Sequence, residues 1–256
     1  MDLGLRGKKA VVTGGTRGIG RAIAETFAAE GADVAVCARN PAQVQETVAA
    51  LKRTGVNAFG AAVDIADGPA FKAWIADAGR LLGGIDILVP NASALAIPST
   101  EQSWEAGFRI DVLGAVRAVE AAKPFLERAA AERGDAAIVL IASTSAAQTD
   151  GESPYGAVKA SLIHYAKGIA RQYAAKRLRA NVVSPGTVYF KGGVWNTVEQ
   201  KDPQRFETML KRNPTGRMAT PQEVANAVVF LASPASTFTT GINLIVDGAI
   251  TARVNY

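Results

Sequence analysis

The chain has 256 residues, 48% of them hydrophobic and 20% charged, which is enough apolar material for one large α/β domain. Its 28 Lys and Arg exceed its 23 Asp and Glu by a net charge of +5, spread along the chain, which argues against the concentrated basic face of a nucleic-acid-binding protein. With Cys37 as the only cysteine, and with neither a signal-like apolar run nor a segment of about 18 apolar residues, we expect a cytoplasmic protein without disulfides or a membrane span.

Short runs rich in β-branched residues alternate along the chain with longer, Ala-rich stretches of helical period. The runs that predict strands are Ala10–Thr13, Val34–Ala38, Ala58–Val63, Ile85–Val89, Ile138–Ala142, Ala180–Ser184 and Asn243–Val246. Strands separated by helices require parallel crossovers and a sheet covered on both faces. We therefore expect an α/β fold in which a single Rossmann-type, doubly wound sheet of about seven mostly parallel strands holds its ligands at the carboxyl ends.

A glycine-rich turn follows the first predicted strand, where residues 13–20 read TGGTRGIG. Glycines at a strand-to-helix turn let the backbone approach a bound group, and the free N–H groups of the following helix attract an anion. This pattern favours a pyrophosphate site, although a tight turn without a ligand remains the alternative. Arg17 in the turn and Arg39 after the second strand predict a site for the adenosine 2′-phosphate of NADP(H), because an NAD site favours an acidic residue there. The alternative for either arginine is a solvated side chain.

Tyr155 and Lys159 are four residues apart, so on a helix they share one face. Ser153 and Pro154 predict the start of that helix, just as Thr220 with Glu223 predicts a capping box further on. An ammonium one turn from a phenol favours the ionised phenol and makes it a usable proton donor and acceptor. Alone, the pair would indicate an ordinary solvated helix. We expect this helix to end near Lys176. The basic residues there are interpreted as cations of its last turn that interact with the carbonyl end of the helix dipole, namely Lys176, Arg177 and Arg179.

Upstream of that pair, the run ending at Ala142 leads into Ser143, so a hydroxyl is expected at a strand's carboxyl end. The combination of TGxxxGIG, a strand-end Ser, YxxxK and Ser184-Pro-Gly186 resembles the short-chain dehydrogenase/reductase family over essentially the whole chain. The resemblance makes Gly14, Gly18 and Gly20 the phosphate turn, and Asp64 with Ile65 the contact to the adenine. It makes Asn91 and Ala92 part of an NNAG segment, and Pro185, Gly186 and Val188 the residues that border the nicotinamide. Together with the two arginines, Arg17 and Arg39, the cofactor residues that we expect in and beside these motifs are Gly14, Thr16, Gly18, Ile19, Gly20, Asp64, Ile65, Asn91, Ala92, Tyr155, Lys159, Pro185, Gly186 and Val188.

The catalytic residues that the resemblance implies are Ser143, Tyr155 and Lys159. In such enzymes hydride passes between the nicotinamide and a carbonyl carbon while the tyrosine, aided by the serine, exchanges a proton with the oxygen. The YxxxK spacing resembles the carbonyl-reductase members more than the enoyl reductases, whose spacing is longer. No metal is required, and His164, the one histidine, is interpreted as structural.

The chain departs from the family pattern at four positions. Pro90 and Ser93 replace the outer residues of NNAG, and Phe190 replaces the threonine expected after Pro-Gly. Asp111 stands where the family usually has Asn, so we include it among the catalytic residues. At that position its carboxylate would lie near Lys159, accept rather than donate, and oppose phenolate formation at Tyr155. The alternative is that Asp111 points towards Arg109 or solvent.

We expect one domain over residues 1–256, with a substrate lid around residues 188–217. Its aromatic residues suggest an apolar pocket wall, or equally ordinary packing under a long surface segment. The substrate is expected to be a ketone or secondary alcohol, with a 3-oxoacyl thioester as the leading specific candidate. The resemblance also implies a homotetramer paired through long helices at about Glu101–Ala131 and Pro154–Lys176. The alternative function is a catalytically weak, dinucleotide-sensing regulatory protein on the same fold.

Overall fold

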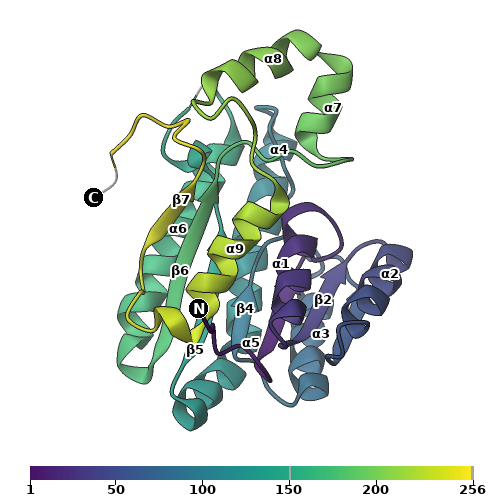
Figure 1. Ribbon diagram of the computed structural model, residues 1–256, viewed down its shortest axis with the longest axis vertical. Helices are drawn as coiled ribbons and strands as arrows, with labels where there is room; N and C mark the ends of the chain where they lie inside the picture. Colours follow the sequence, from purple (N-terminus) through teal and green to yellow (C-terminus); the bar gives the residue numbers. More distant parts are fainter. Residues whose placement is uncertain (150, 255–256) are drawn as a thin grey trace.

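Seven strands form one sheet in the order β3-β2-β1-β4-β5-β6-β7 in the computed structural model, which describes residues 1–149 and 151–254 (Figure 1). All neighbouring strands are parallel, which confirms the expected doubly wound α/β fold. Strand order reverses between β1 and β4, where the loops diverge and leave a crevice outside the carboxyl ends. The strands are β1 (Lys9–Thr13), β2 (Asp33–Ala38), β3 (Ala58–Ala62), β4 (Ile87–Val89), β5 (Ala136–Ile141), β6 (Leu178–Pro185) and β7 (Asn243–Val246).

Every predicted strand is present, and the differences lie at the ends. β4 begins at Ile87 rather than Ile85, whereas β5 and β6 begin two residues earlier than predicted. β6 extends back through Arg179, whose charge disguises a fully buried strand position. A central strand that is buried on both faces tolerates such a charge only when a partner compensates it.

Helices cover both faces of the sheet and give two separate core clusters. Alternate strand residues point to opposite layers, so Val11 belongs to one cluster and its neighbours Ala10 and Val12 to the other. One layer contains α1 (Gly18–Ala29), α2 (Pro41–Lys52) and α9 (Pro221–Ala232), and the other contains α3 (Gly68–Leu82), α5 (Leu113–Arg133) and α6 (Pro154–Tyr173).

The two predicted helix starts are confirmed. Ser153 caps α6 by accepting a hydrogen bond from the Tyr155 N–H at 3.3 Å, with Pro154 in the first helical position. Thr220 and Glu223 form the complete capping box of α9. Because the start of α6 is fixed in this way, Tyr155 and Lys159 are placed in its first two turns, beside the carboxyl end of β5.

Neither of the two long predicted helices is continuous. The first divides into α4 (Glu101–Gly107), a π-helical segment (Phe108–Val112) and α5, and the second ends as an α-helix at Tyr173 before a 3₁₀ turn (Ala174–Lys176). A π-helical segment adds one residue to a turn and redirects the side chains after it, and such segments are frequent at functional sites. Here it contains Asp111.

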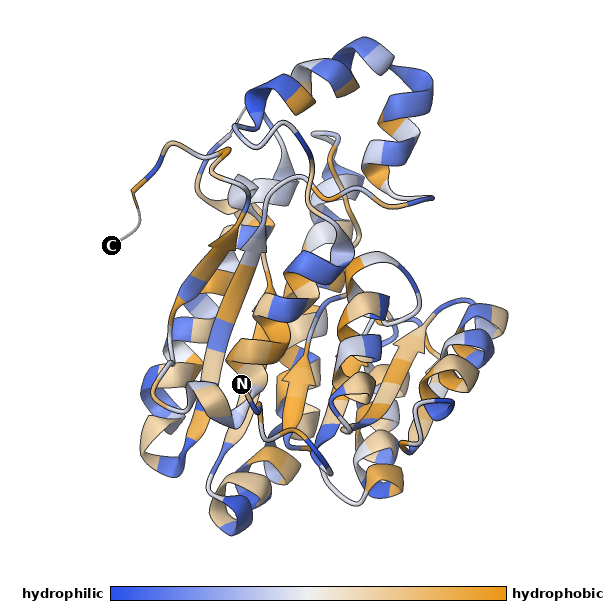
Figure 2. Cartoon of the chain, in the orientation of Figure 1, coloured by the Kyte–Doolittle hydropathy of each residue, from blue (hydrophilic) through white to orange (hydrophobic). Residues whose placement is uncertain are grey.

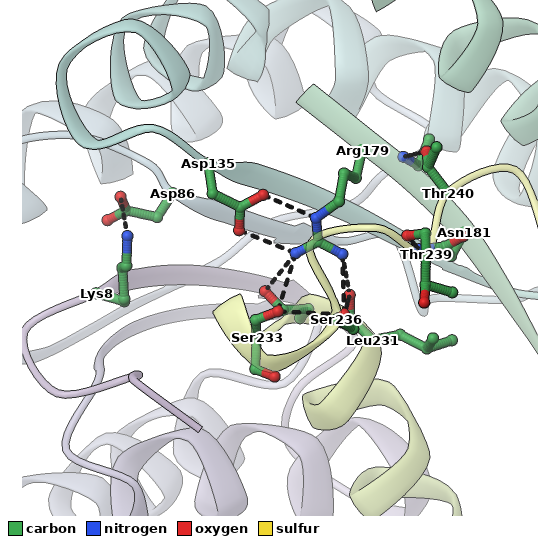
Figure 3. A network of polar contacts seen from close by, with 12 residues as sticks. Lys8, Asp86, Asp135, Arg179, Asn181, Leu231, Ser233, Ser236, Thr239 and Thr240 are labelled. Atoms are coloured by element: carbon green, nitrogen blue, oxygen red, sulfur yellow. Dashed lines mark hydrogen bonds and ion pairs between the residues drawn. The ribbon is translucent and has the colours of Figure 1, made fainter. Parts of the chain in front are cut away.

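The interpretation of Arg179 as a cation in the last turn of a helix is wrong. Its side chain is buried near the start of β6, where the guanidinium donates to both carboxylate oxygens of Asp135, at 2.7 and 2.9 Å (Figure 3). It also donates to the Leu231 carbonyl at 2.6 Å, in the last turn of α9, and to the Ser236 hydroxyl at 3.0 Å, in the 3₁₀ turn that follows this helix. This bidentate pair satisfies the buried charge and connects α9 to the amino ends of β5 and β6.

Two short helices, α7 (Val194–Lys201) and α8 (Pro203–Arg212), stand above the carboxyl ends of the strands (Figure 1). Neither contributes a buried residue, and Figure 2 shows them as mainly hydrophilic in contrast to the strands. Within residues 1–149 and 151–254, no helix combines the length and the apolar character needed to cross a membrane. The same part of the chain contains no cluster of three or more potential His, Cys, Asp or Glu metal ligands.

Candidate active site

A cavity of about 1430 Å³ opens at the carboxyl ends of the strands, as the doubly wound fold predicts. It is large compared with the roughly 300–1,000 Å³ of a drug-sized ligand site. All but two of the predicted site residues line it, the exceptions being Gly18 and Asp111. Those that line it are Gly14, Thr16, Arg17, Ile19, Gly20, Arg39, Asp64, Ile65, Asn91, Ala92, Ser143, Tyr155, Lys159, Pro185, Gly186 and Val188.

The glycine turn connects β1 to α1 and has space only for glycine at its critical positions. Gly14 has φ +65°, and a Cβ atom on Gly20 would lie 2.2 Å from the Gly14 carbonyl oxygen. The helix begins at Gly18, and its N-cap residue Arg17 makes no side-chain capping bond. The first N–H groups of α1 are therefore not capped by the Arg17 side chain, and their positive potential favours an anion at this end of the cavity.

Asn91 holds the glycine turn against the loop that follows β4. Its amide donates to the carbonyls of Thr13 and Gly14 at 3.0 and 3.2 Å, while the Thr13 hydroxyl accepts from the Asn91 and Ala92 N–H groups. Thr13 is a positioning residue that the sequence analysis did not single out. Its place as the first residue of the TGGTRGIG motif is the signal that could have identified it.

Arg17 and Arg39 lie on the wall of the same cavity, and both side chains are exposed. Neither makes a salt bridge or hydrogen bond with another side chain in the part of the chain described. Arg39 directly follows β2, where Ala38, Arg39 and Asn40 offer no carboxylate to a ribose. The second-strand end of the cavity therefore presents positive charge.

Three catalytic candidates reach the cavity from two elements. Ser143 follows β5, and its hydroxyl accepts from the Ser145 N–H at 3.2 Å, which orients the side chain. Tyr155 is half-buried on α6, and the Lys159 Nζ lies 5.7 Å from the centre of its ring. The serine hydroxyl, the phenol and the ammonium therefore share the wall of one cavity.

Lys159 is a buried cation with two fixed protein partners. Its Nζ donates to the Ile141 carbonyl at 3.0 Å and lies 3.0 Å from Asp111 Oδ1. The side chains of Lys159 and Asp111 are 3% and 2% exposed, so each compensates a charge that would be costly to bury alone. Asp111 lies behind the lysine rather than on the cavity wall, and the alternative in which it points towards Arg109 or solvent is wrong.

Asp111 also fixes the loop beside the site. Its Oδ2 accepts from the Ala94 N–H at 2.8 Å, while Oδ1 faces Lys159 at angles that do not make a hydrogen bond. The π-helical segment brings the carboxylate to this position, between α6 and the loop after β4. The residue thus combines a backbone contact with a buried ion pair.

The opposite wall is formed by the segment after β6. A Cβ atom on Gly186 would lie 2.8 Å from the Asp247 Cβ, so glycine permits the close approach of the segment after β7. Val188 then forms a parallel bridge with Ala219, close to the two ends of the segment around residues 188–217 that the sequence predicts as a lid. These contacts fix the points where this predicted lid segment leaves and rejoins the body.

The aromatic residues of the lid divide between the two expected roles. Trp195 and Phe190 line the cavity, whereas Tyr189 packs edge-on against Phe206 with ring centres 5.9 Å apart. The Tyr189 hydroxyl donates to Glu199 at 2.5 Å, and this bond to a carboxylate raises the pKa of the phenol. Tyr189 therefore organises the lid itself, and Phe190 and Trp195 face the ligand space.

Residues 14–251 match the model of a sequence family described as enoyl-(acyl carrier protein) reductase. Isoepoxydon dehydrogenase patN of Penicillium expansum is 34% identical, covering 98% of this chain and 97% of its own length. The 3-oxoacyl-[acyl-carrier-protein] reductase FabG of Staphylococcus aureus is 32% identical, with coverage of 95% and 98%. The chain belongs to the short-chain dehydrogenase/reductase family.

A solved structure of this family shows the same fold in a ligand-bound state. L-Sorbose reductase of Gluconobacter frateurii, complexed with NADPH and L-sorbose, superposes with a TM-score of 0.90 at 31% identity. The match covers 99% of this chain and 100% of the reductase chain. The family assignment confirms the resemblance found in the sequence motifs.

Proposed function

We propose that this protein is an NADP(H)-dependent oxidoreductase that transfers hydride between the nicotinamide and a ketone or secondary alcohol. One observation carries the proposal: Ser143, Tyr155 and Lys159 line the same cavity as the glycine turn at the start of α1. The residues that would hold a dinucleotide and those that would exchange a proton thus share one cavity, which is the arrangement that hydride transfer to a carbonyl requires.

The residues of the cavity fit the cofactor. Glycine at position 20 lets α1 start directly against the Gly14 carbonyl, where a Cβ atom would lie 2.2 Å away, so residues of the turn and of the first turn of the helix both line the cavity. Asp64 and Ile65 follow β3 and line the end of the cavity where an adenine would contact them. Arg17 and Arg39 favour a 2′-phosphate and therefore NADP(H) over NAD(H). When bound, the nicotinamide supplies or accepts the hydride.

The protein's own side chains manage the proton. Tyr155 donates its phenolic proton to the carbonyl oxygen as negative charge develops there, and it accepts the proton in alcohol oxidation. The Ser143 hydroxyl donates a second hydrogen bond to the same oxygen. Lys159 holds positive charge beneath the phenol. Its Nζ donates to the Ile141 carbonyl and forms an ion pair with Asp111, so the ammonium keeps donor capacity for a group in the cavity.

The substrate class follows from the spacing and the relatives. The matched family's description names an enoyl reductase, whereas the four-residue Tyr155–Lys159 spacing favours chemistry at a C=O group. The names of the relatives reported above describe an isoepoxydon dehydrogenase, a 3-oxoacyl-[acyl-carrier-protein] reductase and an L-sorbose reductase. These descriptions support a ketone or secondary alcohol, and a 3-oxoacyl thioester stays a specific candidate.

A substrate panel tests the function. Purified protein is assayed with NADPH and NADH against ketones that include a 3-oxoacyl thioester, a ketose and a cyclohexenone, and in reverse with the matching alcohols. We expect turnover of at least one pair, with NADP(H) preferred. Cofactor binding without turnover of any substrate would instead favour the dinucleotide-sensing alternative.

A further inference from the structure

The ring of Phe190 lies directly on the glycine turn. A Cβ atom on Gly18 would lie 2.5 Å from Phe190 Cζ and 2.8 Å from both Cε atoms, so the ring rests where any other side chain would stand. Gly18 has φ +51° and is the first residue of α1. Glycine is therefore required here by the backbone and by the ring together.

The same ring is connected to the first lid helix through a tight turn. The Gly193 N–H donates to the Phe190 carbonyl at 2.9 Å, and Gly192 between them has φ +77°. Gly193 is the N-cap residue of α7, and a Cβ atom there would lie 2.9 Å from the Phe190 ring. Movement of α7 away from the body must therefore move or release the ring.

Within the phosphate turn, the Phe190 ring covers Gly18. Arg17 and Ile19, on either side of Gly18, line the cavity, whereas Gly18 does not because the ring lies over it. Phe190 itself lines the cavity and packs, half-buried, against the core cluster that contains α1 and α9. The ring thus forms an outer wall of the space beside the helix N-terminus and leaves the rest of the turn open to an anion.

Resting on the proposed function, we propose that Phe190 is a positioning residue that fastens the lid to the phosphate turn, so that bound NADP(H) leaves only after this contact opens. A threonine, which the family pattern has at this position, is too short to reach across to Gly18 as the ring does. The replacement exchanges a polar side chain for an apolar anchor. In this chain, release of the cofactor is therefore coupled to opening of α7.

Stopped-flow displacement of NADPH tests the proposal without relying on activity. Phe190→Thr should raise the dissociation rate of NADPH by about tenfold, the factor that about 1.4 kcal/mol carries, with little change in the association rate. Phe190→Tyr keeps the ring and should restore slow dissociation. Phe238→Thr, at an exposed aromatic residue outside both the lid and the cavity, is the matched control and should dissociate like the wild type.

A second measurement reports on the lid. Trypsin should cut the wild-type lid at Lys191 and Lys201 more slowly when NADPH is bound, and this protection should be lost in Phe190→Thr. If the threonine variant is less stable to heat, both measurements are repeated with Phe190→Leu. Leucine keeps an apolar side chain but is too short to reach Gly18 as the ring does, so fast dissociation and loss of protection are expected again. Normal NADPH binding with unchanged dissociation in Phe190→Thr and Phe190→Leu would overturn this inference alone. Failure of the wild type to bind NADPH would overturn the proposed function as well.

Discussion

Asp111 Oδ1 lies 3.0 Å from Lys159 Nζ, and both side chains are buried behind the wall of the candidate active site. The family pattern has an asparagine at this position, which is neutral. Lys159 faces this carboxylate, and Tyr155 lies beyond the lysine, whose Nζ is 5.7 Å from the centre of the Tyr155 ring. Neither β5 nor the loop from Asn91 to Thr100 contains an ionisable residue, and Glu101, Glu105 and Arg109 nearby on the helical side are exposed.

We predict that Asp111→Asn stays active and moves the rising limb of the pH profile for alcohol oxidation to lower pH. In the variant the Lys159 ammonium beside the phenol is no longer compensated by the carboxylate, so negative charge on the Tyr155 oxygen, which oxidation requires, is favoured. The profile is measured with the best alcohol of the panel and NADP⁺. Asp67→Asn, a charge removal at the N-cap of α3 outside the cavity, should leave the profile in place. An unshifted profile in Asp111→Asn rejects the coupling.

Arg39→Ala should weaken NADPH binding by about tenfold or more, because a hydrogen bond to a charged group contributes roughly 1.5–3 kcal/mol. Binding of NADH, which has no 2′-phosphate, should change little. Fluorescence titration of both cofactors measures the effect, with Arg53→Ala as a control at the exposed end of α2. Equal weakening of both cofactors, or tighter binding of NADH than NADPH by the wild type, would refute the assignment of the 2′-phosphate site.

Glu223→Gln should reduce stability by about 0.5 kcal/mol at neutral pH, a small effect because the carboxylate is partly exposed. Hydrogen bonds from the Arg217 guanidinium lower the pKa of the Glu223 carboxyl to about 2 from its ordinary 4.5. Since the folded-state pKa is depressed, the contribution is complete above about pH 4.5 and is lost as the pH falls towards 2. Denaturant unfolding from pH 7 to pH 3 should show the gap to wild type narrowing, whereas Glu207→Gln on α8 should show little gap at any pH.

We predict a homotetramer assembled through the surfaces of α5 and α6. Phe108 and Leu113, at the two ends of the π-helical segment, are 47% and 44% exposed, and assembly would cover such apolar side chains. Light scattering should give a mass near four times 26.6 kDa. Leu113→Glu should give a lower solution mass than the wild type, because it places a charge in the expected interface. A wild-type monomer of 26.6 kDa at micromolar concentration would contradict this prediction.

Local patterns were sufficient to predict the sheet and the positions of the site residues along it. The strand runs, the glycine turn and the Ser153 cap are written in neighbouring residues, and the doubly wound topology then brings the strand ends to one crevice. The position of Asp111 beside Lys159 was predicted only through the resemblance to a family.

Other features depend on contacts between distant segments and leave no local signal. The π-helical segment adds one residue to a helical turn, and the spacing of the apolar residues after Glu101 gives no sign of this extra residue. Arg179 looked like a helix-end cation because its partner Asp135 is 44 residues away in sequence. The contact of Phe190 with Gly18 joins the lid to the first turn of the fold, and only the folded chain shows it.

Single-turnover oxidation of bound NADPH in wild type and Tyr155→Phe tests the central claim most directly. The substitution removes the proton donor and little volume, so NADPH occupancy should be equal while the rate with the best ketone of the panel falls by about 10²–10⁴. Tyr165→Phe, on the same helix but away from the cavity, should keep the wild-type rate. A loss smaller than about tenfold in Tyr155→Phe, at equal occupancy, would contradict the assignment of Tyr155 as the general acid and with it the proposed carbonyl chemistry.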